Sequence, residues 1–260
     1  MVCGIPDSFS VAAFIKDAKC FGKPDLKVIF VKQKTGRIPG CCRTCGIVQP
    51  FPVRSITEKQ VTMEIFYHGT YRLFGEFSLS FQGTGEGKAK FGHGIYITSS
   101  YATAAKYGAK AAKRNGVDSV YVYTVEVPDI KDDNHVFSCR PVNADVIARV
   151  EKEIGEPIPD EVKVAGKFFR KYIGNLLTGK RGTVKKMMDK ADDAAEDAAL
   201  EFLYGVGVDY LVWPHAQTNP DGITNRAVLC ENRINILKIE QVEVNAKNEL
   251  IPGSGREVIL

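Results

Sequence analysis

Alternating apolar and polar positions predict β-strands in two separate parts of the chain. Each predicted strand is rich in β-branched or aromatic residues, and most end at a glycine, proline or polar turn. The early and middle strands are "EIFYHGT" (64–70), "GIYIT" (94–98) and "SVYVYTVEV" (119–127), and the late ones are "DYLVWP" (209–214), "NRAVLCE" (225–231) and "INILKIEQVEV" (234–244).

Helical periodicity separates these strands. "YATAAKYGAKAAKRNG" follows Ser99 and Ser100, either of which can cap it, and it ends at Gly116. About 75 residues between the middle and late strands then show a mainly helical pattern with apolar positions near a period of 3.6. We expect a helical hairpin inserted at 130–200 into a β framework, which makes the fold class α+β.

The chain divides into three parts by pattern. Residues 1–60 resemble a separate N-terminal extension, bounded by the stiff Pro50-Phe51-Pro52 segment. Residues 61–247 form the expected main domain, and 248–260 a C-terminal tail.

Composition is that of an ordinary globular protein, with 44% hydrophobic and 25% charged residues. No apolar run is long enough to span a bilayer, and the N-terminus does not resemble a secretory signal. We therefore expect a cytoplasmic protein without a membrane partner. A net charge of +4 allows a polyanionic partner without requiring one.

Seven cysteines in an uneven pattern argue against a disulfide framework. Cys42 and Cys45 form a Cys-x-x-Cys pair beside Cys41, and Cys3 with Cys20 could complete a four-thiolate zinc site. Ordinary reduced cysteines are the simpler interpretation, so no metal is expected.

Two short motifs suggest a binding site. In "YHGT", Gly69 leaves its backbone uncovered beside His68, so the backbone can pair with a flat carboxamide; a turn glycine beside a satisfied histidine is the alternative. In "FGHGIYITSSYATAAKYG", Tyr96 ends a strand and Tyr107 lies on the following helix. The two rings could flank a flat aromatic ligand or be core aromatics.

Together these motifs resemble the NAD-binding site of ADP-ribosyltransferases of the diphtheria-toxin and poly(ADP-ribose) polymerase class. The family pattern is His-Gly-Thr, then Phe-Gly-x-Gly-Ile-Tyr-Phe, then a second tyrosine eleven residues after the first. "HGT" and "FGHGIYI" match it, and the resemblance covers about 64–125 and 200–245. It also extends to transferase-like domains of bacteriophage and mobile-element polyvalent proteins.

The resemblance implies a split β-sandwich that binds NAD as the ADP-ribose donor. Gly69 would bind the nicotinamide carboxamide through its backbone, His68 would contact a ribose, and Tyr96 and Tyr107 would enclose the nicotinamide ring. Thr70 and Gly94 belong to the same two motifs and are expected to bind NAD.

Two positions depart from the family. Ala104 stands where many relatives have a serine that holds the carboxamide. Asn225 stands where the family has a catalytic glutamate, so Asn225 would orient the ribose without offsetting the positive charge of an oxocarbenium-like state. Glu86, in the glycine-rich loop 83–87, is a conceivable substitute, whereas Glu231 lies too far along the strand.

The helical segment from Lys163 to Lys186 carries eight basic residues and no acidic one, with aromatic residues interleaved. Such a stripe can bind a nucleic-acid backbone and stack bases, or it can be a solvated face that docks on the acidic helix after it. The stretches "KFGHG" and "AAKYGAKAAKR" add positive charge near the predicted NAD site, which suits a pyrophosphate.

The sequence therefore predicts a mono-ADP-ribosyltransferase acting on a macromolecule, RNA or DNA in preference to protein. By resemblance it would be a bacterial or phage toxin or conflict factor, and an inhibitory partner protein is possible. The alternatives are a protein-directed transferase, a glycohydrolase using water, and a non-catalytic module that binds NAD or ADP-ribose.

Overall fold

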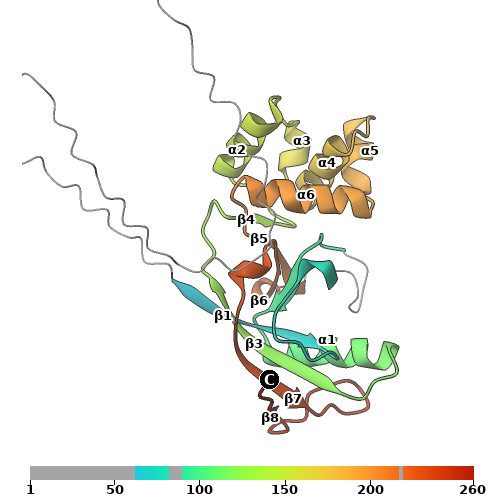
Figure 1. The fold of residues 1–260 in the computed structure, drawn as a ribbon. Helices are drawn as coiled ribbons and strands as arrows, with labels where there is room; N and C mark the ends of the chain where they lie inside the picture. Colours follow the sequence, from blue (N-terminus) through green and yellow to red (C-terminus); the bar gives the residue numbers. More distant parts are fainter. Residues whose placement is uncertain (1–61, 82–89, 217–218) are drawn as a thin grey trace, which may run out of the picture. The chain divides into compact units, whose positions relative to one another are not determined.

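The computed structural model describes residues 62–81, 90–216 and 219–260 (Figure 1). All described residues belong to one compact unit. The extension predicted at 1–60, with Cys41, Cys42 and Cys45, lies outside the described residues, as does the loop with Glu86.

A single sheet dominates the described part of the chain. Its eight strands follow the order β4-β5-β6-β2-β1-β3-β7-β8, and every neighbouring pair is antiparallel except β4 with β5. The strands are β1 (Met63–Thr70), β2 (Ile95–Thr98), β3 (Val120–Pro128), β4 (His135–Phe137), β5 (Tyr210–Ala216), β6 (Asn219–Val228), β7 (Asn235–Val242) and β8 (Arg256–Glu257).

Six α-helices and two short 3₁₀ turns complete the described fold. In Figure 1, α2–α6 gather beyond β4 and β5, whereas α1 lies by itself along β1 and β3. The helices are α1 (Tyr101–Arg114), α2 (Ala144–Ile154), α3 (Asp160–Lys163), α4 (Gly166–Leu177), α5 (Val184–Asp189) and α6 (Asp193–Gly205), and the 3₁₀ turns are η1 (Leu79–Phe81) and η2 (Glu231–Arg233).

The expected strands and the first helix are present, with shifted ends. The Ser100 side chain caps α1 by accepting a hydrogen bond from the Thr103 amide at 3.2 Å. The strand expected at 225–231 instead begins at Asn219 and ends at Val228. The mixed α+β class is therefore confirmed, while the more specific transferase-like split sandwich stays a prediction.

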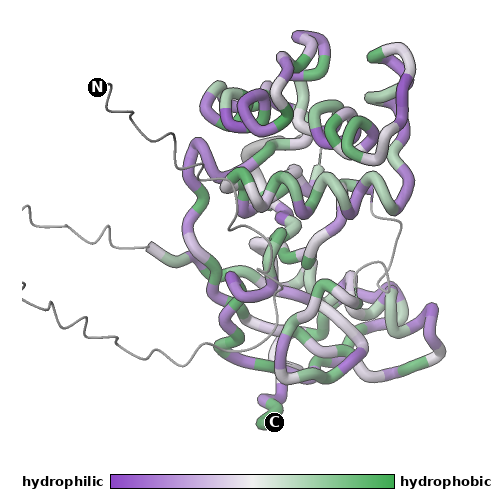
Figure 2. The backbone as a smooth tube through the Cα atoms, turned by 45° about the horizontal axis from the view of Figure 1, so that its top comes forward, coloured by the Kyte–Doolittle hydropathy of each residue, from purple (hydrophilic) through white to green (hydrophobic). Residues whose placement is uncertain are grey.

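The inserted segment contains more helices than the expected hairpin, because it is divided into α2 to α6. Asn143 and Gly155 cap α2, which the periodicity did not separate from its surroundings. α5 and α6 are separate helices, because Asp192 begins α6 by accepting from the Ala195 amide at 3.0 Å. In Figure 2 successive turns of these helices change between hydrophilic and hydrophobic colours, as amphipathic helices do.

Both faces of the sheet are covered. One face carries a core of Phe66, Ile97, Tyr123, Val212 and neighbouring residues. The other face has two coverings: α1 packs its alanines on β3 at one end, and α4 and α6 pack around Leu211 and Trp213 at the other. The second face is therefore shared by two helical layers that come from different parts of the chain.

The sheet has a seam between β1 and β2. These strands share a single register pair, Tyr67 with Thr98. By contrast, β1 pairs with β3 along its whole length, from Met63 to Thr70. The residues of β1 that follow Tyr67, which include the His-Gly motif, therefore lie at the seam.

The segment 248–260, expected as a tail, adds β8 to the β7 edge and forms a bridge between Val244 and Leu250. Among the described helices, none is long and apolar enough to cross a membrane.

Candidate functional site

His68 closes the seam with its side chain. Its Nδ1 donates a hydrogen bond to the carbonyl oxygen of Tyr96 at 2.7 Å, so the imidazole joins two strands whose backbones have stopped pairing. Because Nδ1 holds the proton, Nε2 is left as an acceptor in the neutral ring. Burial lowers the pKa of His68 below its ordinary value, although the bond to Tyr96 opposes this, and the ring stays neutral at physiological pH.

The His68 ring lies against aromatic side chains. Phe77 meets it edge-on with the ring centroids 5.2 Å apart, and Phe74 and Tyr123 lie slightly further away. Since side chains alternate along a strand, His68 points to the face of the sheet opposite to Gly69. His68 and Tyr96 are thus brought together through the Tyr96 backbone.

Gly69 is pressed against α1. A Cβ at this position would lie 1.7 Å from the Ala104 carbonyl oxygen and 3.0 Å from the Gly108 nitrogen, both backbone atoms. The missing side chain therefore lets α1 approach β1 closely. Ala104, which occupies the position of the family serine, contributes its backbone here, and the Thr70 hydroxyl accepts from the Arg72 amide at 3.1 Å.

Tyr96 is held from both ends. Its hydroxyl donates to the Gly92 carbonyl at 2.6 Å, and its ring lies 4.8 Å from the Trp213 ring. Burial raises the pKa of the Tyr96 hydroxyl to about 12. Gly94 has a φ of +133°, and a Cβ there would lie 2.9 Å from the Val228 carbonyl, so glycine is needed to join this turn to β2.

Tyr107 reaches β5 from α1. Its ring centroid lies 6.3 Å from that of His215, and the Lys110 ammonium is 5.7 Å from the Tyr107 ring. The two tyrosines that were predicted to enclose the ligand thus contact different side chains of β5. Tyr96 contacts Trp213, and Tyr107 contacts His215. The arrangement in which both rings enclose nicotinamide stays a prediction.

Asn225 lies on the same face of the sheet as Trp213 and the Tyr96 side chain. The register places it opposite Thr98 on β2 and opposite Trp213 on β5, and residues directly opposite in a sheet point to the same side. Only 3% of Asn225 is exposed, yet its Nδ2 has no hydrogen-bond partner among the described residues. A buried amide hydrogen without an acceptor costs about 1–3 kcal/mol.

Trp213 and His215 are the residues that the sequence interpretation missed. Trp213 stacks on Phe91 with the ring centroids 4.5 Å apart and the planes 3° from parallel. His215 is exposed where the β5–β6 register shifts, between Pro214 and Ala216. A shifted register re-aims side chains, and it is common beside functional sites. The signal available in the sequence was the single tryptophan two residues before a histidine.

A buried ion pair supports the turn before β2. Arg170 on α4 and Glu196 on α6 have Nε and Oε2 3.1 Å apart, with both side chains less than 10% exposed. The pair is poorly aligned, because neither atom makes a well-directed hydrogen bond. Burial lowers the pKa of Arg170 and raises that of Glu196. The Arg170 guanidinium lies beside Gly92, where a Cβ would be 2.2 Å from Nη1.

Near this pair, His93 connects the same turn to α6. Its Nδ1 lies 2.6 Å from an Asp197 carboxylate oxygen, and His93 is 8% exposed. The turn that leads to Tyr96 therefore meets the helical insertion at two points, the Arg170 guanidinium and the Asp197 carboxylate.

The basic segment from Lys163 to Lys186 is partly neutralised within the protein. Lys163 pairs with Glu151 at 3.1 Å and Lys180 with Asp192 at 2.7 Å, in addition to the buried pair of Arg170. The Lys171 ammonium donates to a backbone carbonyl of residue 189. Nucleic-acid binding by this segment stays a prediction.

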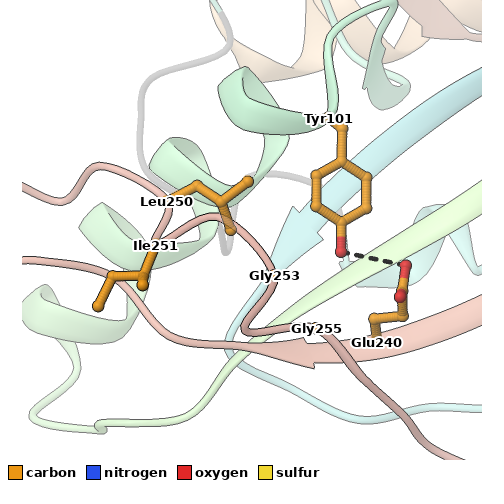
Figure 3. A pocket seen from close by; sticks show the side chains of 6 residues that line it. All are labelled: Tyr101, Glu240, Leu250, Ile251, Gly253 and Gly255. Atoms are coloured by element: carbon orange, nitrogen blue, oxygen red, sulfur yellow. Dashed lines mark hydrogen bonds between the residues drawn. The ribbon is translucent and has the colours of Figure 1, made fainter.

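The described surface has a cavity of about 250 Å³ on the β7 side of the sheet. Figure 3 shows its lining, in which the Tyr101 hydroxyl donates to Glu240 at 3.1 Å. Lys238 also pairs with Glu240, at 2.9 Å, so the polar groups satisfy one another. None of the predicted site residues lines this cavity, and we assign it to the attachment of the C-terminal segment.

Among the described residues, no group of three or more metal-ligating side chains is placed to hold a metal ion. No protein-family model, curated protein or solved structure compared with the chain matches it. The functional argument therefore depends on the chain's own residues.

Proposed function

We propose that this protein is an NAD-dependent mono-ADP-ribosyltransferase that modifies a macromolecule, nucleic acid in preference to protein. The observation that carries the proposal is the buried, unpaired amide of Asn225 on the sheet face that also bears Tyr96 and Trp213. A ligand with an acceptor oxygen would satisfy the Asn225 hydrogen, and the aromatic side chains offer area to a flat ring. NAD has ribose hydroxyls and the flat nicotinamide carboxamide.

The reaction breaks the bond between the ribose C1′ and the nicotinamide nitrogen. Nicotinamide leaves as a neutral molecule and keeps the bonding electron pair, while an oxygen or nitrogen of the acceptor bonds to C1′ and releases its proton. Asn225 can orient a ribose hydroxyl, but a neutral amide cannot offset the positive charge that develops on the sugar. This limited assistance supports transfer of one ADP-ribose rather than chain building.

A non-catalytic NAD-binding module is the second candidate. One observation favours it: the register row Tyr67, Thr98, Asn225 and Trp213 includes no carboxylate. A glycohydrolase that passes ADP-ribose to water would release nicotinamide without labelling any macromolecule. A protein-directed transferase would label only protease-sensitive material.

Three measurements on the full chain separate these functions. Trp213 is the only tryptophan, so its fluorescence reports NAD binding directly. Nicotinamide release from NAD reports bond cleavage. Transfer of ³²P from labelled NAD to a cell lysate, divided into nuclease-sensitive and protease-sensitive fractions, identifies the acceptor.

We expect a fluorescence change, nicotinamide release and nuclease-sensitive label. Asn225→Leu should lose all three, whereas Asn235→Leu, the same change at an exposed position on β7, should retain them. Tyr96→Ala and His68→Ala should also lose nicotinamide release while far-UV circular dichroism shows a folded protein. If NAD changes neither the fluorescence nor the amount of nicotinamide, the proposal is wrong.

A further inference from the structure

Helix α1 carries a concentrated positive charge. It has four basic residues, Lys106, Lys110, Lys113 and Arg114, and no acidic residue. At 100° per residue these four side chains occupy an arc of about 100° around the helix axis. Three of them are exposed and Lys110 is partly buried. We call these four residues the α1 basic ridge.

The rest of α1 fixes the direction of the ridge. The buried residues of the helix are mainly alanines, and they pack on Val120 and Val122 of β3. Gly108 comes so close to β1 that a Cβ there would lie 2.8 Å from the Thr70 nitrogen. A helix held this closely cannot turn about its axis, so the ridge has one fixed orientation, away from the sheet.

The ridge borders the candidate site. Tyr107 lies about 20° beyond Arg114 around the helix axis. Its ring contacts the Lys110 ammonium on one side and the exposed His215 imidazole on another. A polymer bound along the ridge would therefore pass beside His215 and beside Tyr107, which belongs to the predicted NAD site.

The other basic surface is partly neutralised within the protein. In the segment from Lys163 to Lys186, three of the eight basic residues pair with carboxylates of the same chain and another donates to a backbone carbonyl. Paired charges attract a polyanion less than the sequence count suggests. The segment therefore offers a polyanion less charge than its eight basic residues suggest, whereas the α1 basic ridge gathers its four basic residues on one arc.

We infer that the α1 basic ridge binds the phosphate backbone of single-stranded nucleic acid and brings an unpaired nucleotide to the site beside Tyr107. A row of cations suits a polyphosphate backbone, and the exposed His215 ring offers a surface on which an unpaired base can stack. The role of the bound strand as acceptor rests on the proposed function. The binding does not, because it requires neither NAD nor catalysis.

Fluorescence anisotropy of labelled 20-nucleotide mixed-sequence RNA and DNA strands tests this inference in the absence of NAD. The variant is Lys106→Gln/Lys110→Gln/Lys113→Gln. The matched control is Lys167→Gln/Lys185→Gln/Lys186→Gln, which removes the same charge from exposed lysines of the helical segment. Thermal unfolding of both variants verifies that they are folded.

For single strands the slope of log K against log salt is about −0.7 per phosphate contact, so losing three contacts should reduce the slope by about 2. Extrapolated between 1 M and 0.1 M salt, this is a loss of about 100-fold in affinity at 0.1 M. The control should change affinity less than about threefold. Equal weakening in both variants would show bulk charge to be responsible and would overturn the inference.

Other outcomes are equally informative. Absence of oligonucleotide binding by the unmodified protein, or equally tight binding of polyglutamate, would contradict nucleic-acid recognition. If the α1 variant keeps oligonucleotide binding but loses the Trp213 response to NAD, the ridge serves the NAD pyrophosphate and the inference is wrong. Retained oligonucleotide binding by a protein that releases no nicotinamide would overturn the proposed function and leave this inference intact.

Discussion

Replacing Asn225 with leucine should make the protein more stable and remove its response to NAD. The side chain is 97% buried, and its Nδ2 finds no acceptor in the part of the chain that the structure describes. Leucine has a similar outline and no polar atom, so the cost of the unpaired amide disappears. We expect the free energy of unfolding to rise by about 1–3 kcal/mol.

For a unit of this size 1 kcal/mol shifts the melting temperature by about 2–4 °C, so the expected rise is about 2–12 °C. Scanning calorimetry measures the shift, and Trp213 fluorescence in the same samples reports NAD binding. The control Asn235→Leu changes an exposed residue, so the free energy of unfolding should stay within about 0.5 kcal/mol.

A residue that costs stability and is needed for binding is typical of functional sites. The reasoning is refuted if Asn225→Leu lowers the free energy of unfolding by more than 1 kcal/mol and NAD still changes the fluorescence. That result would show that Asn225 makes a structural hydrogen bond.

Three further predictions concern the seam and the turn beside it. Gly69→Ala should lower the free energy of unfolding by about 1–3 kcal/mol or more, measured in urea, because the new Cβ would lie 1.7 Å from the Ala104 oxygen; unchanged stability would contradict the close packing. Tyr96→Phe should cost about 0.5–1.5 kcal/mol through the lost bond to the Gly92 carbonyl but keep the NAD response, whereas loss of the response would give the hydroxyl a direct role. Because the folded pKa of His68 is lowered, its contribution to stability is present above pH 6.5 and is lost as the pH falls through the folded value. The stability lost on acidification should therefore be smaller in His68→Gln than in the unmodified protein. Identical urea titrations of the unmodified protein at pH 5 and pH 7.5 would contradict this.

Local signals in the sequence sufficed for many elements. Alternation located the strands, and Ser100 and the alanine-rich pattern located α1. The helical insertion was harder, because α5 and α6 are separated by only three residues and the break depends on the cap at Asp192. A periodic pattern continues through such a break, whereas the backbone does not.

The site could be predicted only where its residues are neighbours in sequence. The motifs around His68 and Tyr96 were visible, but the alignment of Asn225 with Trp213 depends on strand register between distant segments. Arg170 was counted as part of a basic stripe, although it is buried against Glu196, which lies on another helix. Burial and cross-strand register are tertiary properties that no local window contains.

The seam between β1 and β2 also determines when the site can exist during synthesis. β2 and β6 belong to one side of the seam and β1 and β3 to the other, and Thr98 pairs with Asn225, 127 positions later in the chain. Pairings this distant form late and slowly, because a long loop must close first. β6 must therefore be synthesised before the face with Asn225 can assemble. A nascent chain that ends at α1 contains both sequence motifs but not the site.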